Sequence, residues 1–230
     1  MRYAVISDIH SNLDALEAVV DEIPKGIPIL CLGDVVGYGA QPNEVVEVIQ
    51  RLRPLVVLLG NHDYAVVTGD VGGFSTYAAT GITWTRKHIT AANMQFLSTL
   101  HSEAHLELDH IPVGLYHGSP RDSLFEYIYP EISDEEVESL INESKCKVVL
   151  LGHTHVPMRF HAKGRMLANP GSVGQPRDGN PKASVGFLTV SGGKCELEHT
   201  RVGYDVESAA EKIRQSGLPV FLASRLYEGT

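Results

Sequence analysis

Short apolar runs alternate with amphipathic segments over the first 60 residues. Three such runs are unbroken, which is typical of strands buried on both faces. Between them, apolar side chains recur at helical spacing over residues 13–23 and 45–52, with Ser11 and Pro42 as signals for helix starts. Strands joined by helices in this way are typical of crossover connections, so the pattern predicts an α/β fold. The apolar runs are residues 3–6, 29–32 and 55–59.

The second half of the chain is richer in strand-like segments. Before it, residues 64 to about 98 have a mostly helical pattern, with a cap expected at Thr90. A closing helix is expected over residues 205–215, ended by Gly217. We therefore expect two facing sheets in one domain, residues 1–230, with a mostly helical insertion at about 64–104. The predicted strands of this half are residues 104–108, 113–116, 148–151, 159–161, 166–168, 185–190 and 195–201.

Charge and cysteine usage limit the partners and the compartment. The net charge is −9, so we expect no stable binding to nucleic acid, which requires clustered cations. The cysteines Cys31, Cys146 and Cys195 lie far apart without CxxC spacing, which indicates neither a disulfide framework nor a zinc knot. A reducing, cytoplasmic location fits this usage. No apolar run is long enough to predict a membrane span.

Side chains that can bind metal follow the predicted strands. Asp8, Asp34 and Asn61 come after the first three strands, where α/β folds place functional groups. In an extended backbone alternate residues face the same side, so Asp8 and His10 are expected to converge on one ion. The same spacing occurs in a second His pair near residue 154. The candidate ligands are Asp8, His10, Asp34, Asn61, His117, His153 and His155.

This ligand set suits two cations and a phosphate. Asp34 has two carboxylate oxygens, enough to bridge ions held roughly 3.5–4 Å apart. With two carboxylates among the ligands, two divalent ions leave a surplus of about two positive charges. A water held between them would lose its proton near neutral pH and attack phosphorus. His62 is expected to protonate the leaving oxygen or to stabilise the phosphate, and Asp63 either orients that ring or begins a helix.

Five short motifs occur in order and together resemble those of the calcineurin-like metallophosphoesterases. A further stretch, residues 169–174, resembles the prokaryotic phosphodiesterase-like branch of that family. The resemblance implies a two-sheet β-sandwich flanked by helices on both faces, a four-layer αββα fold. The motifs are Asp8-Ile9-His10, Gly33-Asp34-Val35-Val36-Gly37-Tyr38-Gly39, Gly60-Asn61-His62-Asp63, His117-Gly118 and Gly152-His153-Thr154-His155.

The resemblance also divides the ligands between two metals and gives His62 the role of the acid. One metal would take Asp8, His10, Asp34 and His155, and the other Asp34, Asn61, His117 and His153. Ser/Thr protein phosphatases of the superfamily carry Asp and Arg where this chain has Gly37 and Tyr38, which argues against a dedicated protein phosphatase. Arg177 is our candidate for the missing phosphate clamp, and Arg121 is a second candidate.

Two classes of function remain open at this level. The first is a dinuclear hydrolase of phosphomonoesters, phosphodiesters or nucleotides. The alternative is a non-catalytic metal-binding scaffold of the same fold, as in a retromer subunit that resembles this family. The complete ligand set together with His62 favours the enzyme. Donors of N and O without thiolate favour manganese, with iron or zinc also suitable, while the physiological substrate and the oligomeric state are not predicted.

Overall fold

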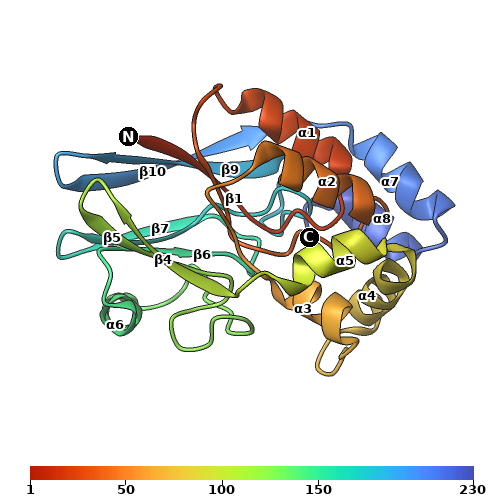
Figure 1. Cartoon of the computed structure of the whole chain (residues 1–230), viewed down its shortest axis with the longest axis horizontal. Coiled ribbons are helices and arrows are strands. Elements are labelled where there is room, and N and C mark those ends of the chain that lie inside the picture. The colour runs from red at the N-terminus through yellow and green to blue at the C-terminus, as the bar shows by residue number, and fades with distance from the viewer.

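Two mixed five-stranded sheets face one another in the computed structural model, which describes residues 1–230 (Figure 1). The first sheet has the order β10-β9-β1-β2-β3, in which β1, β2 and β3 run parallel and β9 and β10 pair antiparallel. The second has the order β4-β5-β6-β8-β7, with β5, β6 and β8 parallel. The strands are β1 (Arg2–Ile6), β2 (Ile29–Cys31), β3 (Val56–Val57), β4 (Glu103–Leu108), β5 (Ile111–Tyr116), β6 (Val148–Leu151), β7 (Met158–Ala162), β8 (Arg165–Asn169), β9 (Ala183–Ser191) and β10 (Lys194–Val202).

Eight helices surround these sheets, and sequence patterning anticipated most of them. The cap of α1 is Asn12, whose side chain accepts from the Ala15 amide, rather than the expected Ser11. Two helices, α6 and α8, were not predicted. None of the eight has the length and apolar character needed to cross a membrane. The helices are α1 (Leu13–Glu22), α2 (Pro42–Leu52), α3 (Asn61–Thr68), α4 (Thr76–His88), α5 (Ala91–Ser98), α6 (Asp134–Ser144), α7 (Val206–Gln215) and α8 (Val220–Glu228).

Three apolar cores stack between the layers. Val5, Leu30 and Leu150 belong to the core between the two sheets, because alternate side chains of each strand face inward. A second core joins the first sheet to α1 and α2 and contains Cys31, which is the small core residue expected. A third core joins the second sheet to α6 through Leu140. The predicted four-layer fold, with helices on both sides of two sheets, is confirmed.

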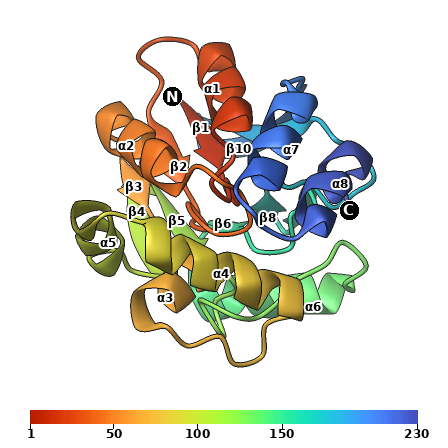
Figure 2. The ribbon, with the colours of Figure 1, turned by 90° about the vertical axis from the view of Figure 1, so that its right-hand side faces the viewer.

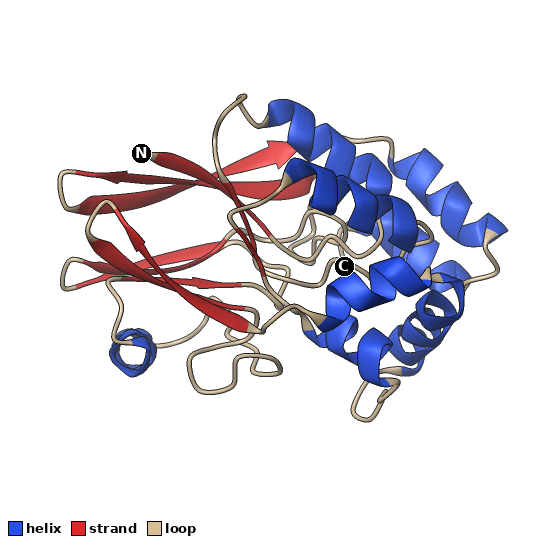
Figure 3. Cartoon of the chain, in the orientation of Figure 1, coloured by secondary structure: helices blue, strands red, loops and turns tan.

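The carboxyl ends of the parallel strands meet at one edge, and most helices gather there. Figure 3 shows strands filling one end of the molecule and helices crowding the other, with α6 alone beneath the second sheet. Viewed from the helical end, α3, α4, α7 and α8 surround the loops that leave the strands (Figure 2). An apolar cluster of α4, α7 and α8 side chains includes Tyr38, so the C-terminal helices pack directly against a loop of the ligand motifs.

Candidate metal site and adjoining cavity

The proposed ligands lie in tight turns rather than in the strands. Strand β1 ends at Ile6 and β6 at Leu151, so the expectation that strand alternation brings Asp8 to His10 is wrong. Asp8 and His10 instead adopt left-handed backbone angles, with φ of 54° and 52°. Asp34, His153 and His155 share this conformation, which is costly for residues with a side chain. Strain concentrated in this way is typical of a functional site.

These turns bring all seven predicted ligands together. One group of four donors and a second group of three each have ligand atoms within 4.8 Å of one another, and Asp34 belongs to both. Its Oδ2 atom lies 3.5 Å from His10 Nε2 and also 3.5 Å from His117 Nε2. Asn61 Oδ1 lies 3.0 Å from His117 Nε2, which places it with the second group. The groups are Asp8, His10, Asp34 and His155, and Asp34, His117 and His153.

Four imidazole rings are held so that each presents a lone pair to the site. In each ring one nitrogen faces a backbone carbonyl, which can only accept, so that nitrogen must carry the proton. In a neutral ring the other nitrogen is then an acceptor aimed at the remaining donors. The bonds run from His10 Nδ1 to Val36 O (3.2 Å), His117 Nδ1 to Leu32 O (2.8 Å), His153 Nε2 to Phe125 O (3.2 Å) and His155 Nδ1 to Gln175 O (2.5 Å).

Burial opposes charge on three of the imidazoles and on both carboxylates. Desolvation lowers the pKa of His153 to about 2 and holds the pKa of His10 and of His155 well below the ordinary range. Desolvation also raises the pKa of Asp8 to about 7 and raises that of Asp34 well above its usual range. Asp8 Oδ1 and Asp34 Oδ2 are buried with no hydrogen-bond donor. Acceptors therefore face acceptors, and divalent cations are the partners that fit such an all-N/O set.

The loop of residues 169–174 braces the two turns that carry ligands. Ser172 Oγ and the Gly174 amide donate to the Asp8 carbonyl at 2.7 and 2.9 Å. Asn169 Nδ2 donates to the Gly152 carbonyl at 2.6 Å, just before the His153 turn. This loop therefore fixes the spacing between ligands that are more than 140 residues apart in the sequence.

His62 lines a cavity beside the ligands, whereas Asp63 does not reach its ring. The His62 imidazole packs edge-on to His10, with ring centroids 4.8 Å apart, and its Nδ1 atom is buried without a partner. Asp63 instead accepts from the backbone amides of Val35 (3.1 Å), Val36 (2.9 Å) and Gly60 (3.0 Å). Of the two predicted roles for Asp63, the structural role at the start of a helix is the correct one.

The cavity, about 520 Å³ in volume, joins the ligands to both arginine and aromatic side chains. Arg177 lines it, with Nη2 2.9 Å from Gln175 Oε1 and 3.2 Å from the Tyr38 hydroxyl. The second candidate, Arg121, is not among the lining residues. It forms ion pairs with Glu126 at 2.7 Å and Glu136 at 2.6 Å, so it is not placed as a phosphate clamp.

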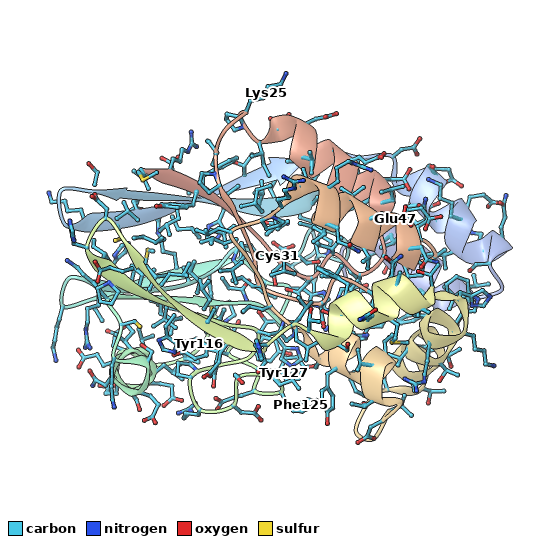
Figure 4. The ribbon with its side chains drawn as sticks, in the orientation of Figure 1. Lys25, Cys31, Glu47, Tyr116, Phe125 and Tyr127 are labelled. Atoms are coloured by element: carbon cyan, nitrogen blue, oxygen red, sulfur yellow. The ribbon has the colours of Figure 1, made fainter.

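Sequence patterning missed two further parts of the cavity wall. Arg225 reaches it from α8, whose only sequence signal is an amphipathic run after Pro219. Tyr127 stacks on His153 with ring centroids 3.7 Å apart. Phe125, two residues earlier on the same loop, lies near α3 (Figure 4). No local motif identifies these aromatic residues, because they lie in an irregular loop between β5 and α6.

A match to a known family bears directly on this geometry. Residues 1–193 match the calcineurin-like phosphoesterase superfamily domain. The chain belongs to the calcineurin-like phosphoesterase superfamily. Membership together with the buried His and Asp cluster supports a metal-dependent phosphoesterase, a hydrolase that acts on small phosphorylated substrates.

Similar proteins cover from about three quarters of the chain to all of it. An uncharacterised protein of Methanocaldococcus jannaschii is 40% identical, and the match covers 98% of this chain and 97% of that protein. A probable metallophosphoesterase of the same organism is 27% identical over 77% of this chain and 70% of its own length. The crystal structure of a metallophosphoesterase from Sphaerobacter thermophilus is 33% identical, covers 100% of both chains and superposes with a TM-score of 0.86.

Proposed function

We propose that the protein is a dinuclear metal-dependent phosphoesterase in which Asp34 bridges the two ions. The observation that carries this proposal is that Asp34 belongs to both donor groups. Its Oδ2 atom has no hydrogen-bond donor and is equidistant from His10 Nε2 and His117 Nε2. Asp8, His10 and His155 complete one ion's ligands, and Asn61, His117 and His153 complete the other's. Bound divalent ions would activate a water and neutralise phosphate charge.

The protein's own groups have separate tasks in this proposal. The carbonyl-bonded imidazoles keep their lone pairs aimed inward, so little reorganisation is needed during a turnover. Arg177 holds non-bridging phosphate oxygens through its guanidinium, whose Nε is buried and lacks a partner. His62 donates a proton to the leaving oxygen from the cavity wall. Burial and the nearby Arg177 cation lower its pKa, and the negative charge of the substrate offsets that effect.

The donor set also supports a choice of metal. It contains imidazole, carboxylate and one amide oxygen but no thiolate, which favours manganese and also suits iron or zinc. The three cysteines are free, and none belongs to either donor group. We therefore propose manganese as the activating ion.

A non-catalytic scaffold is the competing function. Such a protein needs neither an imidazole nor a free arginine in a cavity beside the metal ligands. Here His62 and Arg177 both line that cavity, which supports the enzyme.

Hydrolysis of two chromogenic esters tests the proposal. With manganese added, the protein is expected to hydrolyse p-nitrophenyl phosphate or its bis ester, and a chelator is expected to abolish the reaction. The ratio of the two rates gives the preference for monoester or diester. Absence of turnover on both esters with manganese, iron or zinc, in a folded protein that binds metal, would favour the scaffold.

A further inference from the structure

Two arginines from distant parts of the sequence flank one tyrosine in the cavity wall. The guanidinium carbons of Arg177 and Arg225 each lie 5.7 Å from the centroid of the Tyr38 ring. Arg177 follows the loop that braces the ligands, and Arg225 comes from α8 near the C-terminus. Both line the same cavity as His62 and His153, so the two cations face the space in which a substrate would lie.

No aspartate or glutamate side chain bonds to either arginine. Arg177 bonds to the Tyr38 hydroxyl and the Gln175 amide oxygen, and Arg225 Nε donates to a main-chain oxygen of Thr230, the last residue of the sequence. The other arginines that reach carboxylates, such as Arg214, form ion pairs on the surface. Both cavity arginines are half-buried, and burial together with the Arg177 charge lowers the pKa of Arg225 to about 10. Two cations held this way are stabilised by an anion between them.

The reacting phosphate does not account for this second cation. Arg177 lies directly beside the ligands, since its backbone amide contacts the His155 carbonyl at 3.4 Å. Arg225 reaches the cavity from α8, and its guanidinium carbon lies 5.7 Å from the centroid of the Tyr38 ring. The cavity, at about 520 Å³, is in the size range of sites for whole small molecules, so it extends beyond one phosphate group.

We propose that Arg225, beside the Arg177 clamp in the same cavity, forms a subsite for a second phosphate joined to the one that is cleaved, so the substrate class is a diphosphate ester. This inference rests on the proposed function. Water adds to the terminal phosphorus, and the bond from that phosphorus to the bridging oxygen breaks. The products are inorganic phosphate and a phosphomonoester, whose former bridging oxygen takes a proton from His62. A guanidinium group can bind two phosphate oxygens at once. Arg225 therefore favours diphosphate esters over monophosphate esters.

A matched pair of non-hydrolysable ligands tests the subsite by binding. Titration calorimetry of the manganese-loaded protein would compare methylenediphosphonate with methylphosphonate. We expect the diphosphonate to bind at least about tenfold more tightly, as one charge-assisted fork contributes that much. Arg225→Gln is expected to remove most of this ratio. Arg51→Gln, which changes an exposed arginine in the last turn of α2, is expected to retain it.

Substrate kinetics give a second readout on the same variants. The ratio of kcat/KM for methyl diphosphate to that for methyl phosphate should fall at least about tenfold in Arg225→Gln and less in Arg225→Lys, which keeps the charge without the fork. Arg225→Lys also serves if the glutamine variant does not fold. Equal ratios in wild type and both Arg225 variants, with active enzyme, would overturn the subsite alone. A wild-type protein that binds manganese but hydrolyses neither nitrophenyl ester nor methyl diphosphate would instead overturn the proposed function.

Discussion

His10 Nε2 lies 3.1 Å from His155 Nε2, although 145 residues separate them in the sequence. Both rings give their Nδ1 proton to a backbone carbonyl, so the two Nε2 atoms are acceptors that point at each other. Such a contact is repulsive unless a cation lies close to both lone pairs. Asp8 Oδ1 is 3.3 Å from the same His155 nitrogen, so the repulsion extends to a carboxylate. The metal-free protein is therefore expected to be less stable than the metal-loaded one.

Removing the bridging charge should empty the site. Asp34→Asn keeps the shape of the side chain but removes the carboxylate that belongs to both donor groups. We expect the metal content, measured by plasma mass spectrometry, to fall from about two ions per chain to less than one. Asp21→Asn changes an exposed carboxylate of α1 and should retain the wild-type content. Full occupancy in Asp34→Asn would contradict a bridging role.

The role of His62 as a proton donor predicts a dependence on the leaving group. His62→Ala should retain its metals but lose about 10²–10⁴-fold in kcat. The loss should be larger for phenyl phosphate than for p-nitrophenyl phosphate, because phenolate needs a proton more than nitrophenolate does. His110→Ala, at a fully exposed ring, is the matched control. An equal loss on both esters would mean that His62 only positions the phosphate.

Gly60 allows the Asp34 turn to approach α3 closely. A Cβ at Gly60 would lie 2.0 Å from Asp34 Oδ1 and 2.2 Å from the Asp34 amide nitrogen. Gly60→Ala is therefore expected to cost about 2–3 kcal/mol of unfolding free energy and to reduce metal content. Gly203→Ala has nothing within 4 Å of its new Cβ and should change neither urea unfolding nor metal content. Similar behaviour of the two variants would show that the turn is compliant.

His199 should contribute to acid sensitivity away from the ligands. Burial lowers its pKa below the ordinary 6.5, although its Nε2 bonds to the Asn169 carbonyl at 2.8 Å. Below about pH 6.5 the unfolded chain binds a proton at this residue that the folded chain does not. The free energy of unfolding therefore decreases as the pH decreases. Between about pH 7.5 and 5.5, urea unfolding should show a smaller fall in His199→Gln than in wild type. The exposed His110→Gln control should match wild type.

The fold was largely predictable from periodicity, because buried strands are short apolar runs and their helices carry one apolar face. All ten strands overlap segments that the sequence pattern predicted, some as apolar runs and others, such as β4 and β10, as mixed apolar and polar segments. The helices α6 and α8 were not predicted, and they differ in the local signal that the sequence offers. The start of α6 was predictable, because Ser133 caps it ahead of three acidic residues. The start of α8 has no such signal, because this helix follows Pro219 without a polar cap.

The site was predictable in its membership but not in its geometry. Residue type and position after strands identified the seven proposed ligands, which the structure brings together. The left-handed turns at Asp8 and His10 could not be predicted, since nothing local requires them and the 169–174 loop holds them in place. Arg225 was missed for a similar reason, because only tertiary packing of α8 brings it to the cavity.

Anomalous X-ray diffraction from crystals grown with manganese would show whether Asp34 bridges two ions. We expect two anomalous peaks roughly 3.5–4 Å apart, with the Asp34 carboxylate between them and His10 and His117 on opposite sides. A single peak, or two peaks that do not share Asp34, would contradict this bridging role.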